Sequence, residues 1–574
     1  MDSDVPWMGA AYERVTGDLG QVANRRLVDA WRNRRREPAA VRIRDGVWQI
    51  VGVTGVNHTV VDAPDGLIVV DTGWNDSVGA RVRELVRGVS NRPIAALVYS
   101  HSHFCFGAEG LVPLSERAGL RVHAHHRVPA NIARLVSHEE PGLYFLRMAQ
   151  FGTPLPARGP DADPIGTPSG IVGPKRYLAP TDLWRENGAD GAIAGEPVRV
   201  YTEYPFDSDD QLILHFPRLG VVVHGHQSRN LPNLASNGGG RFRDPQPWLD
   251  GLDLMLRIGP EHLLGVHGPH VSGSAEVRRV LTEQRDALQY LYDQSVRGIN
   301  RGQTPRETVD AMELPESLAR SPDLSENYAQ WDYHVKAVYA GLLNWYSGDA
   351  VDLLPIPERF ESERMVEGFG GLPRMLETIR AERERGHHAW AAKLARHCVR
   401  AQPDCAEARE LLSASLREMG QGAYALTTRG VCLTQAQEWA GGPSRRDLPM
   451  HADPSLADLA PPGAWVRALG FRLPPGRVVA PPCTLRVRFT DRDFVCGVCL
   501  RNGVAAYVEG AALPETADFS VELPLALWLE VFFGQRSWTD ALASRGAASP
   551  QPAADWERFW RRFDPRPPYR RTCV

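Results

Sequence analysis

The sequence predicts an α/β protein of several domains, and three features of its hydrophobic pattern support this. A short apolar segment at residues 94–98 follows a proline and ends in a polar turn, as a buried strand does. From about residue 275 the apolar residues recur at a helical period, and after about residue 445 they alternate again as in strands. With 574 residues, the chain is also longer than one hydrophobic core requires. We therefore expect a sheet-rich first part, a helical middle and a small α/β domain at the end.

The first part of the chain contains one clear α/β unit. Residues 1–40 are expected to form an N-terminal arm that ends near a basic run. The apolar residues 66–70 then form a strand that ends at Asp71, and an amphipathic helix follows at 77–89. This helix leads back to the strand at 94–98. Strand, helix, strand and a turn that carries candidate ligands form one α/β unit in this order.

Histidines follow several of the predicted strands. His101 and His103 are two residues apart in a tight turn, so both imidazoles can reach one cation. Neutral imidazole suits zinc, iron and copper. His224 and His226 are also two apart, on a predicted strand, and therefore project to the same face. Another apolar segment ends at His267. The pattern indicates a metal site in the first domain.

Composition excludes several classes of partner from the prediction. The net charge of −4 gives no reason to expect a nucleic acid partner. The N-terminus carries acidic residues and lacks the pattern of a secretory signal, and no apolar run approaches the ~20 residues of a membrane span. The eight cysteines are scattered without a framework spacing, which is typical of reduced thiols. We expect a cytoplasmic protein that acts on a small molecule.

These segments, in their order, resemble the class III alkyl sulfatases of the metallo-β-lactamase superfamily, the dodecyl-sulfate-hydrolase type. The resemblance rests on the Asp71-Thr-Gly and His101-x-His103 turns and on four later segments. These are Tyr290-Leu-Tyr-Asp-Gln-Ser, His334-Val-Lys-Ala-Val-Tyr339, Asn344-Trp-Tyr-Ser-Gly348 and Asn502-Gly503. It implies an αββα metallo-β-lactamase sandwich at 41–275, a helical dimerisation domain at 276–440 and a sterol-carrier-like α/β domain at 445–574. It also implies a homodimer and two zinc ions that activate water against a sulfate ester.

The same resemblance assigns metal ligands residue by residue. His101 and His103 match the first two ligands, Glu203 in Thr-Glu-Tyr-Pro matches a first-metal carboxylate, and His267 matches the late histidine. We expect His101, His103 and Glu203 to form one first-metal set.

Several positions depart from the family pattern. Cys105 replaces the family's aspartate, Phe106 its second-metal histidine, and His226 its bridging glutamate. The arginine thought to hold sulfate falls on Gly238, which removes a bidentate anion clamp. A second site would have to recruit His226 and His267, with Cys105 or His224. We therefore expect about one bound metal ion and inefficient sulfatase activity.

The sequence does not distinguish between zinc and iron, or between the reactions that these metals support. Zinc with two histidines and a carboxylate keeps an open position and activates water, which favours a hydrolase of small or amphiphilic esters. The same ligand set is the facial triad of non-haem iron enzymes, so an iron-dependent oxidoreductase is the alternative. A third alternative is a catalytically silent binding or scaffold protein. Asp71 is assigned a supporting catalytic role, in which it orients a metal-ligating histidine. Its alternative role is that of a strand-end turn carboxylate.

Overall fold

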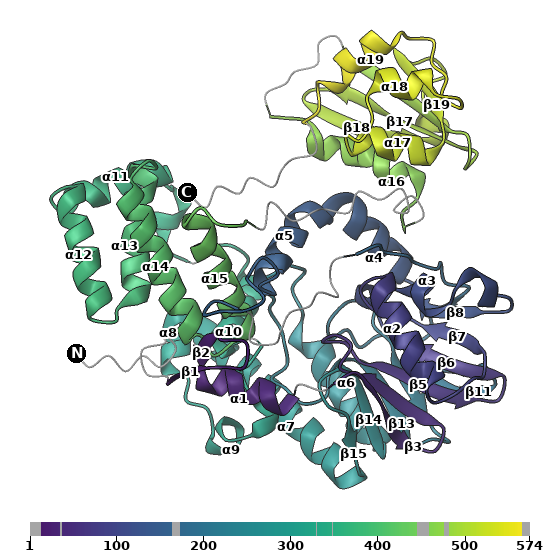
Figure 1. Ribbon diagram of the computed structural model, residues 1–574, viewed down its shortest axis with the longest axis horizontal. Coiled ribbons are helices and arrows are strands. Elements are labelled where there is room, and N and C mark those ends of the chain that lie inside the picture. Colours follow the sequence, from purple (N-terminus) through teal and green to yellow (C-terminus); the bar gives the residue numbers. More distant parts are fainter. Residues whose placement is uncertain are drawn as a thin grey trace.

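The structure is a computed structural model (Figure 1). It describes residues 13–34, 37–162, 173–328, 330–346, 348–444, 459–475 and 482–564.

Two mixed sheets form the first domain. The first sheet has seven strands in the order β3-β4-β5-β6-β7-β8-β9, and the second has six in the order β10-β11-β12-β13-β14-β15. The bounds of the first sheet are β3 (Ala39–Arg44), β4 (Val47–Val51), β5 (His58–Ala63), β6 (Gly66–Val70), β7 (Ile94–Val98), β8 (Arg121–His125) and β9 (Asp182–Trp184). Those of the second are β10 (Ala189–Ile193), β11 (Glu196–Tyr201), β12 (Ile213–Phe216), β13 (Val221–Gln227), β14 (His262–His267) and β15 (Val271–Ser272).

The apolar faces of the two sheets form one buried core. Ile68 and Val98 of the first sheet belong to the same cluster as Leu214 and Val223 of the second. Helices cover the outer faces: α2 (Asp76–Arg87) packs on the first sheet, and α6 (Pro245–Ile258) and α7 (Ser274–Asn300) pack on the second. The αββα sandwich expected from the sequence is therefore confirmed.

Parallel pairing brings the predicted histidine turns to one edge. β6 pairs in parallel with β7, and β13 pairs in parallel with β14. Asp71 and His101 follow β6 and β7, while His226 and His267 lie at the ends of β13 and β14. The carboxyl ends of parallel strands meet at the same edge of a sheet, which is where ligands commonly bind.

Helices dominate the middle of the chain, as the sequence predicts. They begin with α7 and continue through α8 (Pro305–Ala311), α9 (Glu316–Ala319), α10 (Trp331–Leu343), α11 (Glu358–Gly368), α12 (Leu372–Glu384), α13 (His388–Ala401), α14 (Ala406–Gly422) and α15 (Leu426–Trp439). The described part of the N-terminal arm, β1 (Arg14–Thr16), β2 (Val22–Asn24) and α1 (Arg25–Arg34), docks on these helices. Asn24 Nδ2 donates to Gly422 O at 3.0 Å, and Arg429 Nη1 donates to Val22 O at 2.8 Å.

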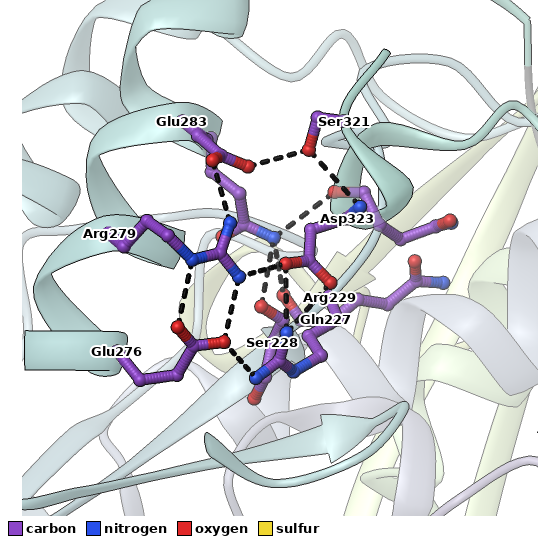
Figure 2. A network of polar contacts seen from close by, with 10 residues as sticks. Gln227, Ser228, Arg229, Glu276, Arg279, Glu283, Ser321 and Asp323 are labelled. Atoms are coloured by element: carbon purple, nitrogen blue, oxygen red, sulfur yellow. Dashed lines mark hydrogen bonds and ion pairs between the residues drawn. The ribbon is translucent and has the colours of Figure 1, made fainter. Parts of the chain in front are cut away.

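An ionic network centred on the buried Asp323 joins the sandwich to the helical region (Figure 2). Asp323 is almost fully buried and accepts ion pairs from Arg229 (2.8 Å) and Arg279 (2.6 Å). Both arginines also pair with Glu276. Arg229 follows β13 directly, while Arg279 and Glu276 lie on α7. The strand that carries His224 and His226 is thus tied by charge to the first long helix.

The last described region is a small α/β domain. Its sheet has the order β18-β17-β16-β19, with β16 (Cys483–Phe489), β17 (Phe494–Arg501), β18 (Val504–Glu509) and β19 (Phe519–Leu523). Its helices are α16 (Pro462–Arg467), α17 (Leu525–Phe532), α18 (Trp538–Ala543) and α19 (Ala553–Trp560), and they bury Trp465, Trp528, Trp538 and Trp556. The likeness to a sterol carrier and the domain boundaries at 40, 275, 440 and 445 stay predictions. Residues 445–458 lie outside the described residues.

None of the described helices combines the length and the apolar character that a membrane crossing requires.

Candidate metal centre

Three side chains converge at the edge where β7 ends. β7 ends at Val98, and after His101, whose backbone is extended, the chain makes the single turn η2 (Ser102–Phe104), which includes His103. His103 Nδ1 lies 2.8 Å and His101 Nε2 3.3 Å from the same oxygen, Oδ2 of Asp207. One ligand atom from each of the three residues lies within 4.8 Å of the other two. Asp207 comes from the loop between β11 and β12.

The turn that follows Asp71 holds the histidine turn in place. The backbone N–H groups of Thr72 and Gly73 both donate to Phe104 O at 2.9 Å, and Thr72 Oγ1 donates to the same oxygen at 3.1 Å. Phe106 N donates back to Gly73 O at 3.0 Å. Because these bonds cross between the ends of two adjacent parallel strands, the two turns are positioned together.

Asp71 reaches His101 through Ser100. Its Oδ1 accepts from Ser100 N at 2.8 Å, and its Oδ2 accepts from Ser100 Oγ at 2.7 Å. Ser100 Oγ lies 2.9 Å from His101 Nδ1 and, with its own hydrogen directed to Asp71, accepts from Nδ1–H. This leaves the lone pair of His101 on Nε2, the nitrogen that faces Asp207. Burial raises the pKa of Asp71 to about 6.

Charge balance at the centre is dominated by Asp207. Although its burial favours the neutral acid, Arg243, whose Nη2 lies 2.6 Å from Oδ1, and the two histidines hold the pKa of Asp207 well below its usual value. Burial lowers the pKa of His101, but the nearby Asp207 carboxylate more than offsets this and the pKa is raised. For His103, burial prevails and the pKa is lowered.

The three side chains fit a metal ion. His101 Nε2 is buried and has no hydrogen-bond partner among the described residues, so a strong polar atom points into the group without being satisfied there. Two imidazole nitrogens and one carboxylate oxygen are a donor set that both zinc and iron(II) accept.

Glu203 does not join the group, in contrast to the expectation from the sequence. Its side chain is exposed, and the carboxylate that meets His101 and His103 is Asp207, four residues later in the same loop. A signal for Asp207 was present in the run Asp207-x-Asp209-Asp210 directly before a strand. The other two carboxylates of that run bind Asn131 Nδ2, at 2.7 and 2.8 Å, and so support the loop.

Cys105 is positioned as a structural thiol. Its Sγ donates to His101 O at 3.2 Å, and burial raises the pKa of the thiol well above its usual value. The side chain is fully buried, as is that of Phe106. The Sγ atom is directed at the backbone of His101, and Cys105 is not part of the group formed by His101, His103 and Asp207.

The remaining predicted histidines surround the group without belonging to it. His267 Nδ1 donates to Gly55 O at 2.7 Å, which leaves its lone pair on Nε2. The His226 ring packs edge-on against Trp248, with centroids 4.4 Å apart, and His224 Nε2 lies 3.4 Å from Ser228 Oγ. Burial lowers the pKa of all three rings.

Comparison with known proteins identifies relatives along most of the chain. Residues 304–442 match the family model described as alkyl sulfatase dimerisation. A linear primary-alkylsulfatase of Pseudomonas sp. (strain ATCC 19151) is 30% identical over 474 residues, which cover 79% of this chain and 88% of the relative. An (R)-specific secondary-alkylsulfatase of Pseudomonas sp. is 27% identical, with 91% of this chain and 80% of the relative covered. The solved structure of the inverting sec-alkylsulfatase Pisa1 from Pseudomonas sp. shares the fold, with a TM-score of 0.82 at 22% identity and coverage of 97% and 92%.

Proposed function

The chain belongs to the alkylsulfatase family of hydrolases, and from this we propose that it hydrolyses an ester of an amphiphilic alcohol with one metal ion held by His101, His103 and Asp207. The observation that carries the proposal is the convergence of both histidines on a single carboxylate oxygen. A zinc ion held by these three residues would lower the pKa of a bound water molecule toward 7 and would supply positive charge.

The protein's own groups prepare this centre. Asp71 and Ser100 fix the tautomer and orientation of His101, which is the role that a carboxylate behind a ligating histidine commonly has. Arg243 keeps Asp207 ionised and orients it, because one of its oxygens is occupied by the guanidinium and the other faces the histidines. The carboxylate therefore needs no reorientation when a cation binds.

An aromatic wall beside the centre supports an amphiphilic substrate. Phe104 packs edge-on against Trp74, with ring centroids 5.0 Å apart, and Trp74 packs against Phe151 at 6.3 Å. Phe104 is buried, whereas Trp74 and Phe151 are partly exposed. An alkyl chain that lies along the two partly exposed rings would be removed from water close to the metal ligands.

Slow turnover of sulfate esters is part of the proposal. The family's second-metal aspartate and histidine correspond to Cys105 and Phe106; a phenyl ring cannot bind a metal, and the Cys105 thiol is hydrogen-bonded to His101 O. A single ion provides less transition-state charge than a pair of ions does.

We also propose that the protein is a homodimer through the helical region. Within the segment that matches the dimerisation family, large apolar side chains between the end of α10 and the start of α11 are exposed: Leu342, Leu343, Trp345, Val351, Leu353, Leu354, Ile356 and Phe360. A stretch in which so many apolar side chains are exposed is typical of a surface that binds another protein chain. A second copy of the chain is the occupant that the family match supports.

The test is metal-dependent release of alcohol and sulfate from octyl sulfate. Protein stripped with a chelator should lose activity, and zinc should restore it without any need for oxygen. Asp207→Asn should abolish the restored activity, whereas Glu203→Gln, a matched carboxylate change in the same loop, should leave it within about twofold. Full activity in the stripped protein would contradict the proposal, and iron-dependent oxygen consumption would support the oxidoreductase instead.

A further inference from the structure

The loop at residues 233–243, between β13 and α6, is closed by the same arginine that holds the metal-centre carboxylate. Arg243 Nη1 donates to Asn233 O at 2.6 Å, and Nη2 of the same guanidinium lies 2.6 Å from Asp207 Oδ1. Because a guanidinium is a rigid planar fork, a shift of the 233–243 loop would move both contacts together. The position of this loop therefore sets how Arg243 meets Asp207.

Gln150, the last residue of α5 (Glu140–Gln150), holds the middle of the 233–243 loop. Its Oε1 accepts from Ser236 Oγ at 2.8 Å and from Gly238 N at 2.5 Å, and only 1% of its side-chain surface is exposed. A Cβ atom at Gly238 would lie 2.7 Å from Arg147 Cγ, so the approach of the loop to α5 requires a glycine there. The loop is thus packed on α5 and bonded to its last side chain.

The nitrogen of the same amide is tied to the helical region. Gln150 Nε2 donates to Tyr328 Oη at 3.1 Å. The backbone oxygen of Tyr328 accepts from Thr427 Oγ1 at 2.7 Å and from Thr427 N at 3.4 Å, and Thr427 lies in the first turn of α15. α15 also packs against α5 itself, because a Cβ atom at Gly430 would collide with Gln150 O. One side chain therefore connects α15 with the 233–243 loop.

The chemistry of a buried amide makes this connection specific. An amide removed from water is costly unless its oxygen and nitrogen are both bonded, and those bonds are directional. Gln150 uses its oxygen for the loop and its nitrogen for Tyr328, so it fixes the separation of the two. An apolar side chain of equal length would fill the space without fixing either partner.

We propose that Gln150 is a positioning residue of the metal centre. By holding Ser236 and Gly238 it sets the reach of Arg243 to Asp207, and through Tyr328 it makes this reach depend on how α15 is packed. The inference deepens the proposed function and rests on it, because it takes Asp207 as a metal ligand. The segment that matches the dimerisation family, which includes Tyr328 and α15, would thereby influence metal binding in the first domain.

The experiment measures zinc affinity of the full-length protein by competition with a chromogenic chelator. Gln150→Met keeps the length of the side chain without the amide and should weaken zinc binding about tenfold, as the loss of a group behind a metal ligand commonly does. Gln421→Met is the matched control: this buried glutamine on α14 donates to Asp161 Oδ1 at 2.9 Å, away from the 233–243 loop. Its zinc affinity should stay within about twofold of the wild type.

A double variant separates positioning through Arg243 from general loosening of the fold. In an Arg243→Met background, the further change Gln150→Met should alter zinc affinity by less than about twofold, because the group through which Gln150 acts is already absent. Wild-type affinity in Gln150→Met, or a full additional loss in the double variant, would overturn the inference. If Gln150→Met does not fold, Ser236→Ala replaces it in the same comparison, because this change on the partly exposed loop removes one bond to Gln150 Oε1.

Tyr328→Phe tests the link to α15. It removes the phenol that accepts from Gln150 and leaves the bonds of Gln150 to the loop in place, so we expect a smaller loss of zinc affinity than in Gln150→Met. Wild-type affinity in Tyr328→Phe would overturn the dependence on α15. Since zinc affinity is measured without turnover, the expected losses in a protein that cleaves no ester would support the inference and contradict the proposed function.

Discussion

Asp207 uses its two oxygens for different partners: Oδ1 is 2.6 Å from Arg243 Nη2, and Oδ2 faces the nitrogens of His101 and His103. The carboxylate therefore stays ionised and directed at the histidines despite its burial. This arrangement makes the identity of the metal-binding carboxylate directly testable.

Elemental analysis of protein purified without chelator should find about one zinc or iron ion per chain. Asp207→Asn and His103→Ala should each lose it, since each removes one of three ligands. Glu203→Gln should retain the ion, because Glu203 is exposed outside the group. Retention in Asp207→Asn together with loss in Glu203→Gln would show that the ligand assignment is wrong. Two ions per chain that are both lost in Cys105→Ala would indicate a second site built around sulfur.

Ser100→Ala and Asp71→Asn should weaken metal binding without removing a ligand. Both break the chain of hydrogen bonds that orients His101, and losses of about 10–100-fold in affinity are typical for such partners. Competition with a chromogenic chelator measures the affinity. Asp182→Asn, which changes a surface carboxylate paired with Arg121, is the control and should have wild-type affinity. Wild-type metal affinity in both Ser100→Ala and Asp71→Asn would show that Asp71 does not support the metal ligand His101 and has only a structural role in the turn.

Leu354→Asp together with Trp345→Ser should dissociate the dimer. Both side chains are exposed, at 86% and 71% of their surface, so the two changes remove little packing within one chain. Sedimentation should show the wild type at about twice the 63.5 kDa of one chain and the double variant at 63.5 kDa. A wild-type protein that sediments as a monomer at micromolar concentration would refute the dimer.

Glu326 should make the protein less stable as pH rises. Burial raises its pKa from 4.5 to about 7, and one of its oxygens accepts from Trp331 N at 2.8 Å. The folded state therefore holds a proton that the unfolded state has lost between pH 4.5 and 7, and the free energy of unfolding falls over that interval.

Glu326→Gln should remove this pH dependence, because its amide oxygen can still accept the hydrogen bond. At pH 8 we expect a gain of about 1–3 kcal/mol in urea unfolding, and at pH 4.5 little difference. Glu363→Gln, an exposed glutamate paired with Arg359, serves as the control. Equal effects of the Glu326 change at both pH values would rule out the raised pKa.

Asp323→Asn should destabilise the junction of the sandwich with α7. It leaves Arg229 and Arg279 without their shared buried partner, which we expect to cost about 2–4 kcal/mol. Asp310→Asn breaks a surface pair with Arg306 and should cost at most about 0.5 kcal/mol. The first transition in thermal unfolding is the measurement, and equal shifts for the two variants would contradict a coupling role for the network.

Local sequence patterns were enough to predict the strands and the turn that carries His101 and His103. The apolar residues 66–70 and 94–98 predict two buried strands, because a strand in a sheet covered on both faces is apolar along its length and five residues are too few for a helix. The spacing of His101 and His103 predicts that they bind the same metal ion, because both belong to one short turn. The helical period after residue 275 likewise predicts the helices, since each has one face on a core.

Local patterns could not identify the carboxylate that lies beside His101 and His103. Glu203 and Asp207 lie in one loop, and the motif around Glu203 is the more conspicuous of the two. Which of them turns inward depends on Arg243 and on the asparagine that binds Asp209 and Asp210, both distant in sequence. The proximity of Arg147 to Gly238 is likewise set by the packing of α5 (Glu140–Gln150) against a loop some ninety residues later. The sequence by itself determined which segments form strands, helices and a histidine turn, because periodicity and spacing are local. Only the tertiary structure decided which charges meet, because an ion pair depends on distances between segments that no local pattern encodes.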